Sequence, residues 1–216
     1  MIGEFFMIKS RILKLVKSNF KNKNDSVLDL GCGNEPYYHK DITGKLVCFD
    51  IKKTGTGNVV GNANLLPFKN NTFDSVVSIN SFYYFDDPFA SSKEVCRVLK
   101  KNGRFFLITP FIYPIHDVPD DKYRFTEFGL REIFKNDFTI KEIKTIGGIF
   151  NLKAIFFHSM IKGLKFIFPK PLRFLSILLI IVLYPLYLLA QLLSLLDVLD
   201  RTRRWPTYYF VLAVKK

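Results

Sequence analysis

Residues 27–36 decide the fold, and they read Val-Leu-Asp-Leu-Gly-Cys-Gly-Asn-Glu-Pro. An apolar run ends here in an acid and two glycines, and glycine lets a backbone turn tightly and approach a ligand without a Cβ. Nineteen residues after Gly31, a second apolar run, Leu46–Phe49, ends in Asp50. An acid at the tip of a second strand can accept hydrogen bonds from both hydroxyls of a ribose. This layout predicts a nucleotide-binding β-α-β unit.

Strand and helix signals alternate beyond this unit. Short apolar strands separated by helices favour a largely parallel sheet that is covered on both faces. An amphipathic helix is expected over residues 5–20, and a second helix is expected to end at Lys101, before a stop at Asn102-Gly103. The expected strands are 26–30, 45–50, 57–60, 73–79, 103–109, 138–145 and 208–214.

The charge of the chain is unevenly distributed. The formal net charge is +13 over 216 residues. Residues 1–150 contain 22 Lys/Arg and 17 Asp/Glu, whereas residues 151–216 contain 10 and 2. The basic surplus therefore lies in the most apolar part of the chain. Basic residues interleaved with apolar ones indicate an anionic membrane surface as partner, and they make nucleic acid an unlikely one.

The most apolar segment is residues 174–196, which hold no charge over 23 positions. That length suffices to cross a bilayer. If the strand at 208–214 joins the main sheet, both ends of the segment lie on one side, which argues against a single crossing. Pro185 is expected to break the helix into two short pieces. We expect a re-entrant or interfacial helical hairpin after an amphipathic helix over 151–170, and the alternative is a soluble cap or dimer interface.

Five motifs in order resemble the class I S-adenosylmethionine-dependent methyltransferases of the broad type 11 group. The resemblance covers residues 27–129. It implies a Rossmann-like, doubly wound, seven-stranded α/β sheet, mostly parallel with an antiparallel last strand, and a helical apolar insertion before that strand. The motifs are the turn at 29–33, the acid Asp50, and the segments 61–68, 73–78 and 97–103.

The resemblance implies S-adenosyl-L-methionine as the cofactor and assigns roles around it. The glycine turn would hold the amino-acid end of the cofactor, with Asp29 orienting the turn. Asp50 would take the ribose hydroxyls, the loop at Asn62 would meet the adenine, and the end of the fourth strand would lie beside the sulfonium. The expected cofactor residues are Asp29, Gly31, Cys32, Gly33, Asp50, Ile51, Asn62, Ala63, Ile79 and Asn80.

Two departures from known patterns bear on the ligand. Many relatives carry Asp at position 62, but the Asn62 carbonyl still offers an acceptor to an exocyclic amine. Pro36 stands where a dinucleotide fingerprint has its third glycine, which disfavours NAD. The three cysteines lack metal-ligand spacing, and no metal is expected.

The segment after the fifth strand, residues 110–126, gathers polar groups at the carboxyl edge of the sheet, where open α/β folds bind ligands. Its Pro-x-His-x-x-Pro-x-Asp-x-x-Arg-Phe-Thr pattern resembles methyltransferases of surface-glycan and lipid-linked sugar pathways. His116 is a candidate base, and Arg124 is a candidate anion ligand. Alternatively, these side chains only tie the loop together. Thr126 is expected to cap a helix. The candidate catalytic residues are His116, Asp117, Asp120, Tyr123 and Arg124.

Tyr83 and Tyr84 stand where many relatives carry Glu-His. The exchange removes a possible base and leaves an apolar wall, which suits an apolar or sugar acceptor or serves packing alone.

These patterns predict a membrane-associated methyltransferase, on the cytoplasmic face, with a lipid-linked, glycan or amphipathic acceptor. The alternatives are a methyltransferase for a soluble small molecule or RNA, with the apolar segment as the cap of a homodimer, and a non-catalytic membrane adaptor. The expected organisation is a core over residues 1–150, a basic apolar insertion over 151–206, and the last strand over 207–216.

Overall fold

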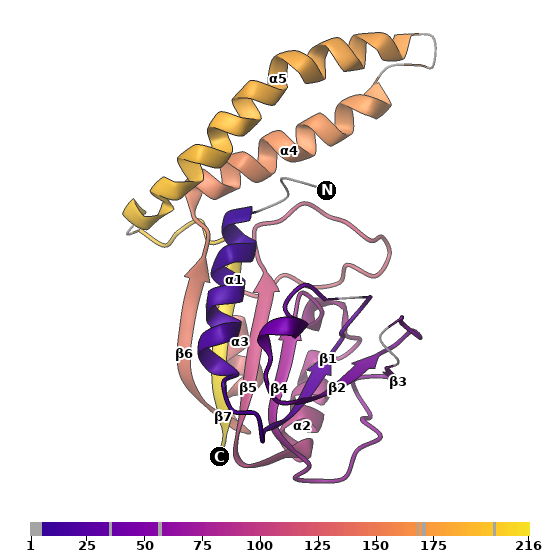
Figure 1. Cartoon of the computed structure of the whole chain (residues 1–216), viewed down its shortest axis with the longest axis vertical. Helices are drawn as coiled ribbons and strands as arrows, with labels where there is room; N and C mark the ends of the chain where they lie inside the picture. Colours follow the sequence, from indigo (N-terminus) through magenta and orange to yellow (C-terminus); the bar gives the residue numbers. More distant parts are fainter. Residues whose placement is uncertain (1–5, 35, 56–57, 168, 170–171, 201) are drawn as a thin grey trace. The chain divides into compact units, whose positions relative to one another are not determined.

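The computed structural model describes residues 6–34, 36–55, 58–167, 169, 172–200 and 202–216. Its strands form one seven-stranded sheet in the order β3-β2-β1-β4-β5-β7-β6 (Figure 1). The pairs β1–β2, β1–β4, β2–β3 and β4–β5 are parallel, and β7 is antiparallel to β5. The predicted Rossmann-like fold class is therefore confirmed. The strands are β1 Ser26–Leu30, β2 Lys45–Asp50, β3 Val59–Val60, β4 Phe73–Ile79, β5 Leu99–Pro110, β6 Phe138–Ile146 and β7 Tyr208–Lys215.

Five α-helices and three short 3-10 turns accompany the sheet in the described part of the chain. The helices are α1 Phe6–Asn19, α2 Pro88–Val98, α3 Glu127–Phe134, α4 Ile149–Ile167 and α5 Arg173–Leu193. The turns are η1 His39–Asp41, η2 Phe82–Tyr84 and η4 Ser194–Leu199. Thr126 caps α3 as predicted, because its Oγ1 accepts a hydrogen bond from the Gly129 amide at 3.0 Å.

Two expected boundaries need correction. The second predicted helix ends at Val98, and β5 already begins at Leu99, which is fully buried and pairs with Phe73. Burying Leu99 on the sheet takes precedence over another helical turn. The left-handed residue of the following bend is Asn102, at φ 62°. The third predicted strand is confirmed at residues 59–60, and residue 57 lies outside the described residues.

Phenylalanines fill the core on both faces of the sheet. Successive residues of a strand point to opposite faces, so Phe105 and Phe106 of β5 serve different layers. The Phe105 ring lies 5.6 Å from that of Phe134, and the Phe106 ring lies 4.9 Å from that of Phe210, centroid to centroid. Phe20, which follows α1, packs 5.3 Å from Phe106. The predicted amphipathic helix therefore covers this second face.

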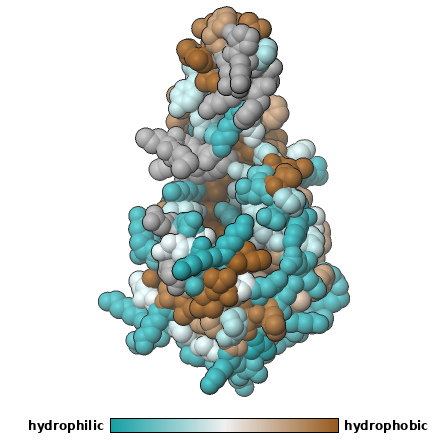
Figure 2. Space-filling model, turned by 90° about the vertical axis from the view of Figure 1, so that its right-hand side faces the viewer, coloured by the Kyte–Doolittle hydropathy of each residue, from teal (hydrophilic) through white to brown (hydrophobic). Residues whose placement is uncertain are grey.

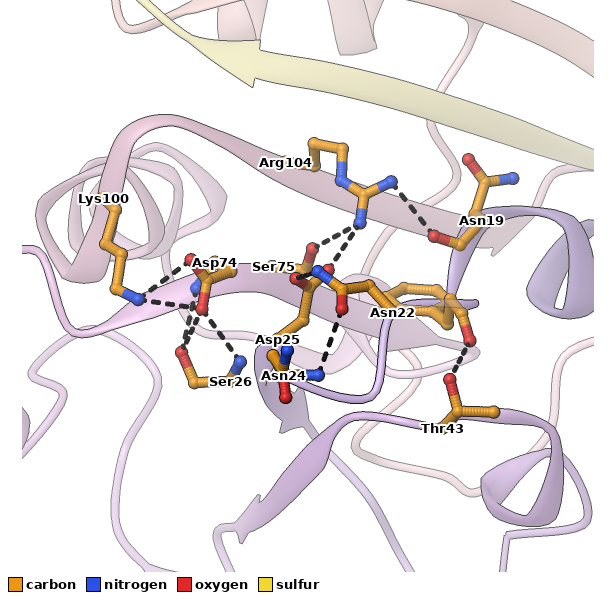
Figure 3. A network of polar contacts seen from close by, with 11 residues as sticks. Asn19, Asn22, Asn24, Asp25, Ser26, Thr43, Asp74, Ser75, Lys100 and Arg104 are labelled. Carbon is orange, nitrogen blue, oxygen red and sulfur yellow. Dashed lines mark hydrogen bonds and ion pairs between the residues drawn. The ribbon is translucent and has the colours of Figure 1, made fainter.

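A polar network ties the amino ends of the central strands together (Figure 3). The Arg104 guanidinium of β5 donates to Asp25 Oδ2 at 3.1 Å and to Ser75 Oγ of β4 at 3.2 Å. Asp74 accepts from the backbone N–H of Ser26 at 2.9 Å and from Lys100 Nζ at 2.8 Å. Because the network lies at the amino ends, it leaves the carboxyl ends of the same strands available for a ligand.

The chain divides into two compact units. Residues 12–111, 115–144 and 208–216 make up the sheet unit. Residues 1–11, 112–114 and 145–207 make up the other, which we call the hairpin unit because α4 and α5 are its main elements. The predicted insertion, 151–206, falls within the hairpin unit.

Inside the hairpin unit, α4 and α5 pack side by side in opposite directions (Figure 1). Ser176 Oγ, near the start of α5, donates to the Leu164 carbonyl near the end of α4 at 2.9 Å. Further along, the rings of His158 and Tyr187 lie 5.7 Å apart. The expectation that Pro185 breaks the apolar helix is wrong, because α5 is continuous through it. The long helical stretches on both sides keep α5 continuous, although proline removes one backbone hydrogen bond.

Asp197 and Asp200 close the base of the hairpin. Asp197 Oδ2 accepts from the Gly148 amide at 2.9 Å, and its Oδ1 accepts from the Phe150 amide at 3.0 Å. Asp200 Oδ2 accepts from the Ile149 amide at 3.4 Å. These carboxylates satisfy the amides at the start of α4 and suit its positive dipole end. They are the only two acids of residues 151–216.

Much of the side-chain surface of α5 is exposed in the described part of the chain, although one face packs on α4. The apolar stretch Phe174–Leu199 has a mean hydropathy of 2.3 and is 17% buried over its most apolar window. By length and composition it could cross a membrane. Ile177, Ile181 and Val182 are each 60% exposed or more. Figure 2 shows hydrophobic side chains gathered at the top, on the hairpin.

The Asp74 network predicts a pH-dependent contribution to stability. Partial burial raises the pKa of Asp74, but hydrogen bonds from Lys100 and Ser26 outweigh burial and lower this pKa from 3.8 to about 2. A lowered pKa stabilises the fold above the unfolded value, and the benefit is lost as pH falls towards 2. We expect Asp74→Asn to lose about 1 kcal/mol of unfolding free energy at neutral pH, after allowance for solvent screening.

Urea unfolding at a series of pH values measures this difference. The gap between wild type and Asp74→Asn should shrink between about pH 4 and pH 2. Glu132→Gln, on the exposed surface of α3, is the control and should show no such gap. A gap that stays constant down to pH 2 would contradict the assignment.

Candidate cofactor site

The glycine turn lies between the ends of β1, β2 and β4. Gly31 and Gly33 have φ values of 81° and 61°, which favour glycine. The amides of Gly31 and Cys32 donate to the Phe49 carbonyl at 2.8 and 3.1 Å. A Cβ on Gly31 would lie 2.3 Å from Ser81 Cβ, whereas a Cβ on Gly33 would meet nothing within 4 Å. Gly31 is thus required for packing, and Gly33 borders open space.

Asp29 lies beneath the turn, fully buried. It accepts from the Tyr38 hydroxyl at 2.9 Å and pairs with His39 Nε2 at 2.5 Å. Burial raises the pKa of Asp29, although its bonds to His39 and Tyr38 act to lower it. The carboxylate does not line the cavity described below; it ties the turn to the 36–41 segment, in keeping with the expected orienting role.

Asp50, at the end of β2, holds the turn from the other side. Its Oδ2 accepts from the Gly33 amide at 2.9 Å, and its Oδ1 accepts from the Lys52 amide at 3.1 Å. Each carboxylate oxygen has a further lone pair for a ligand. The carboxylate is therefore preorganised, with its orientation set by the backbone.

A cavity of about 490 Å³ opens at this point of the sheet, between the carboxyl ends of β1 and β4. The strand order reverses here, which is where open α/β sheets bind ligands. Of the expected cofactor residues, Gly31, Gly33, Asp50, Ile51, Asn62, Ala63 and Asn80 line the cavity, and Asp29, Cys32 and Ile79 do not. The other lining residues are Phe49, Lys52, Gly61, Ser81, Tyr84, Phe85, Asp86, Asp117, Asp120 and Lys122.

Polar groups at two places of this wall suit a ligand. Asn80, at φ 57°, lines the cavity, and its buried Oδ1 has no hydrogen-bond partner among the described residues. Asn62 Oδ1 accepts the Asn64 amide at 2.9 Å, while its Nδ2 donates to Asp86 Oδ2 at 3.1 Å. Asp86 also pairs with Lys122. An unsatisfied buried acceptor is costly, so Asn80 favours a donor-bearing ligand in the cavity.

The loop after β5 is fastened by a set of polar contacts. His116 Nε2 lies 2.9 Å from the Tyr83 hydroxyl, and His116 Nδ1 lies 3.3 Å from Asp121 Oδ2. Arg124 makes a two-pronged pair with Asp121, one contact being 2.6 Å, and lies over the Tyr83 ring. Hydrogen bonding to Arg124 lowers the pKa of Asp121, despite partial burial.

The predicted catalytic residues therefore separate into two groups. Asp117 and Asp120 line the cavity, whereas His116, Tyr123 and Arg124 do not. Tyr123 donates through its hydroxyl to the Asp86 carbonyl at 3.0 Å. These last three side chains join the loop to itself and to the segment after β4, which is the alternative that sequence reasoning left open.

Sequence reasoning missed several members of this arrangement. Asp121 has a signal of its own, since it lies three residues before Arg124 and next to Asp120. Ser81 and Asp86 have none, because their contacts join segments far apart in the chain. Tyr84 is more than an apolar wall, since its hydroxyl donates to Asp117 Oδ2 at 2.7 Å. Among the described residues, no group of three or more His, Cys, Asp or Glu is placed to hold a metal.

Comparison with known proteins matches the middle of the chain. Residues 28–107 match the model of the methyltransferase domain. The matched residues contain the glycine turn, Asp50 and the loop at Asn62.

Two curated relatives match part of this chain. The ubiquinone/menaquinone biosynthesis C-methyltransferase UbiE of Haemophilus ducreyi is 33% identical over an alignment of 129 positions that covers 50% of this chain and 49% of that protein. The human mitochondrial arginine-hydroxylase NDUFAF5 is 34% identical over an alignment of 91 positions that covers 36% of this chain and 26% of that protein. The chain spans about half or less of the length of these relatives.

Solved structures share the fold over more of the chain. One comes from a Haloferax volcanii complex between a methyltransferase and its activator protein, with 20% identity, a TM-score of 0.59, and coverage of 93% of this chain and 87% of that one. Another is a SAM-dependent methyltransferase of Aquifex aeolicus, with 18% identity, a TM-score of 0.51, and coverage of 63% and 82%. These two structures show the shared fold, and the methyltransferase-domain match indicates S-adenosyl-L-methionine as the cofactor, as expected from the motifs.

The two glycines of the turn predict different effects on substitution. Gly31→Ala should destabilise the fold, because its Cβ would overlap Ser81 and its φ is positive. A Cβ at position 33 has open space around it, so Gly33→Ala introduces only the strain of a positive φ. It should therefore cost less stability than Gly31→Ala, and its methyl group should narrow the cavity. Urea midpoints measure stability. Equal midpoint losses for the two variants would contradict the geometry of the turn.

Proposed function

We propose that this chain is an S-adenosyl-L-methionine-dependent methyltransferase that acts at a membrane surface. The observation that carries the first part is the cavity where Asp50, Gly33 and Asn80 meet. Its volume, about 490 Å³, lies in the range of small-molecule sites. The orphaned Asn80 Oδ1 and the open space at Gly33 fit a ligand that brings donors close to the backbone.

The chain's own residues would hold the cofactor in three places. The backbone of the glycine turn and Asn80 would receive its amino-acid end, Asp50 would accept the ribose hydroxyls, and Asn62 would border the adenine. The cofactor, when bound, supplies a methyl group that already carries its leaving group. The protein's part is therefore to position the donor and the acceptor and to exclude water.

The residues of the post-β5 loop would face the acceptor. Asp117 and Asp120 are the carboxylates of this loop that line the cavity, and they would receive a proton from a hydroxyl or amine acceptor. Tyr84 fixes Asp117. We assign His116 and Arg124 to positioning, because Asp121 and Tyr83 hold both of them.

The second part of the proposal, association with the cytoplasmic face of a membrane, rests on the hairpin unit. Its apolar stretch Phe174–Leu199, formed by α5 and η4, exposes apolar side chains over 26 residues. The described cations Lys153, Lys162, Arg203 and Arg204 are exposed as well. Apolar and basic groups together suit an anionic bilayer surface. Such a location favours a lipid-linked, glycan-bearing or amphipathic acceptor over a soluble one. UbiE, a relative, carries the name ubiquinone/menaquinone biosynthesis C-methyltransferase.

Substitution of Asp50 tests the cofactor site. Asp50→Ala removes the acceptor for the ribose and frees the Gly33 amide, so we expect S-adenosyl-L-methionine affinity to fall at least about a hundredfold, as for the loss of charge-assisted hydrogen bonds. Isothermal titration calorimetry on the full chain measures it, with Glu132→Gln as the unchanged control. Saturable binding of equal strength in Asp50→Ala would contradict the proposal. Absence of any wild-type binding would reject it.

Substitution on α5 tests membrane association. Ile181→Asp combined with Val182→Asp places two acids on an exposed apolar face, and each costs about 3 kcal/mol at bilayer depth. We expect the wild type to float with phosphatidylglycerol vesicles and the double variant to remain in the dense fraction. Phe128→Asp, on the exposed face of α3, should float like the wild type. A wild type that stays at the bottom of the gradient would instead favour a soluble acceptor and a dimer cap.

A further inference from the structure

A second cavity, of about 400 Å³, lies within the hairpin unit, and we call it the base groove. Residues of the first turns of α4 and the tryptophan after η4 form its walls. The side chain of Phe156 is 65% exposed and that of Trp205 is 47% exposed, so large apolar groups border water here. The lining residues are Ile149, Leu152, Lys153, Phe156, Phe157 and Trp205.

Positive charges outnumber negative ones among the residues at the base groove. Lys153 lines the groove, and the exposed Arg203 and Arg204 directly precede Trp205 in the chain. The acids Asp197 and Asp200 face the amides at the start of α4, whose positive dipole end offsets part of their charge. The three cations therefore leave a positive surplus that attracts an anion.

We infer that the base groove binds one hydrocarbon chain of an anionic membrane phospholipid, whose phosphate is met by Lys153, Arg203 and Arg204. This inference rests on the proposed membrane association and names the lipid subsite within it. The groove has five apolar lining side chains and one cationic one, which matches an amphiphile with an apolar tail and an anionic head. Trp205, bordered by two arginines and a proline, is of the residue type that favours the interface between headgroups and acyl chains.

Charge distinguishes a lipid from a second copy of the chain as the occupant. A two-fold interface would bring the same patch of both copies together. Lys153, Arg203 and Arg204 would then lie close to their own equivalents, and they outnumber Asp197 and Asp200, the two acids of residues 151–216. The apolar stretch Phe174–Leu199 belongs to the same unit and could enter the bilayer beside a lipid held in the groove.

Trp205 provides a direct readout, because it is the only tryptophan of the chain. Its fluorescence is measured on the full-length protein with phosphatidylcholine vesicles that contain phosphatidylglycerol. Bromine atoms are placed on the acyl chains of either lipid in separate preparations. If the groove selects the anionic lipid, brominated phosphatidylglycerol should quench Trp205 about twofold more than brominated phosphatidylcholine at equal mole fraction.

Two variants locate the subsite. Phe156→Ala removes an exposed wall of the groove, and Lys153→Glu reverses its charge while suiting the positive end of α4. Each should abolish the preference for brominated phosphatidylglycerol and weaken vesicle binding on the order of tenfold. The matched controls are Phe128→Ala on α3 and Lys93→Glu on α2, both at exposed positions, and they should behave like the wild type.

The outcomes separate the inference from the function on which it rests. Equal quenching by both brominated lipids, with normal flotation of every variant, would overturn the lipid subsite and leave membrane association standing. No flotation of the wild type would overturn both. Cofactor binding, measured without vesicles, is independent of either result and tests methyl transfer alone.

Discussion

The contact between the glycine turn and its two neighbours is the constraint on which the site depends. Gly31 packs against Ser81 so closely that no side chain fits at position 31, and the Gly33 amide donates a hydrogen bond to Asp50. Ser81 in turn donates to the Leu30 carbonyl at 2.7 Å, so the ends of β1 and β4 are joined. The three strand ends β1, β2 and β4 are thereby held at fixed spacing, and the cavity between them keeps its shape without a ligand.

Two opposing requirements explain how the polar groups are distributed. At the amino ends of the strands, Arg104 donates a hydrogen bond to Asp25, and Asp74 accepts one from the Ser26 amide. These bonds stabilise the fold. At the carboxyl ends, Asp50 and Asn80 keep acceptors available, and Asn80 bears the cost of an unpaired buried oxygen. A buried unsatisfied group of this kind is rare in a folded protein and is explained here by a ligand.

How much could be predicted depended on the range of the interaction. The turn at Gly31 and the acid at Asp50 follow from local patterns, because strand periodicity and glycine punctuation are written in neighbouring residues. Ser81 and Asp86 do not, since their partners lie far away in the sequence. Pro185 does not break α5, because the helical stretches on both sides outweigh its local preference. Asp197 could not be predicted as a cap, since it acts 46 to 49 residues from the amides it satisfies.

The central claim is that the cavity beside the glycine turn holds the methyl donor. The most direct measurement is an experimental structure of the full chain grown with S-adenosyl-L-homocysteine, the demethylated form of the cofactor. The account predicts density along Gly31 and Gly33, with the ribose hydroxyls on Asp50 and a donor on Asn80 Oδ1. Density elsewhere, with Asp50 facing only water, would contradict it.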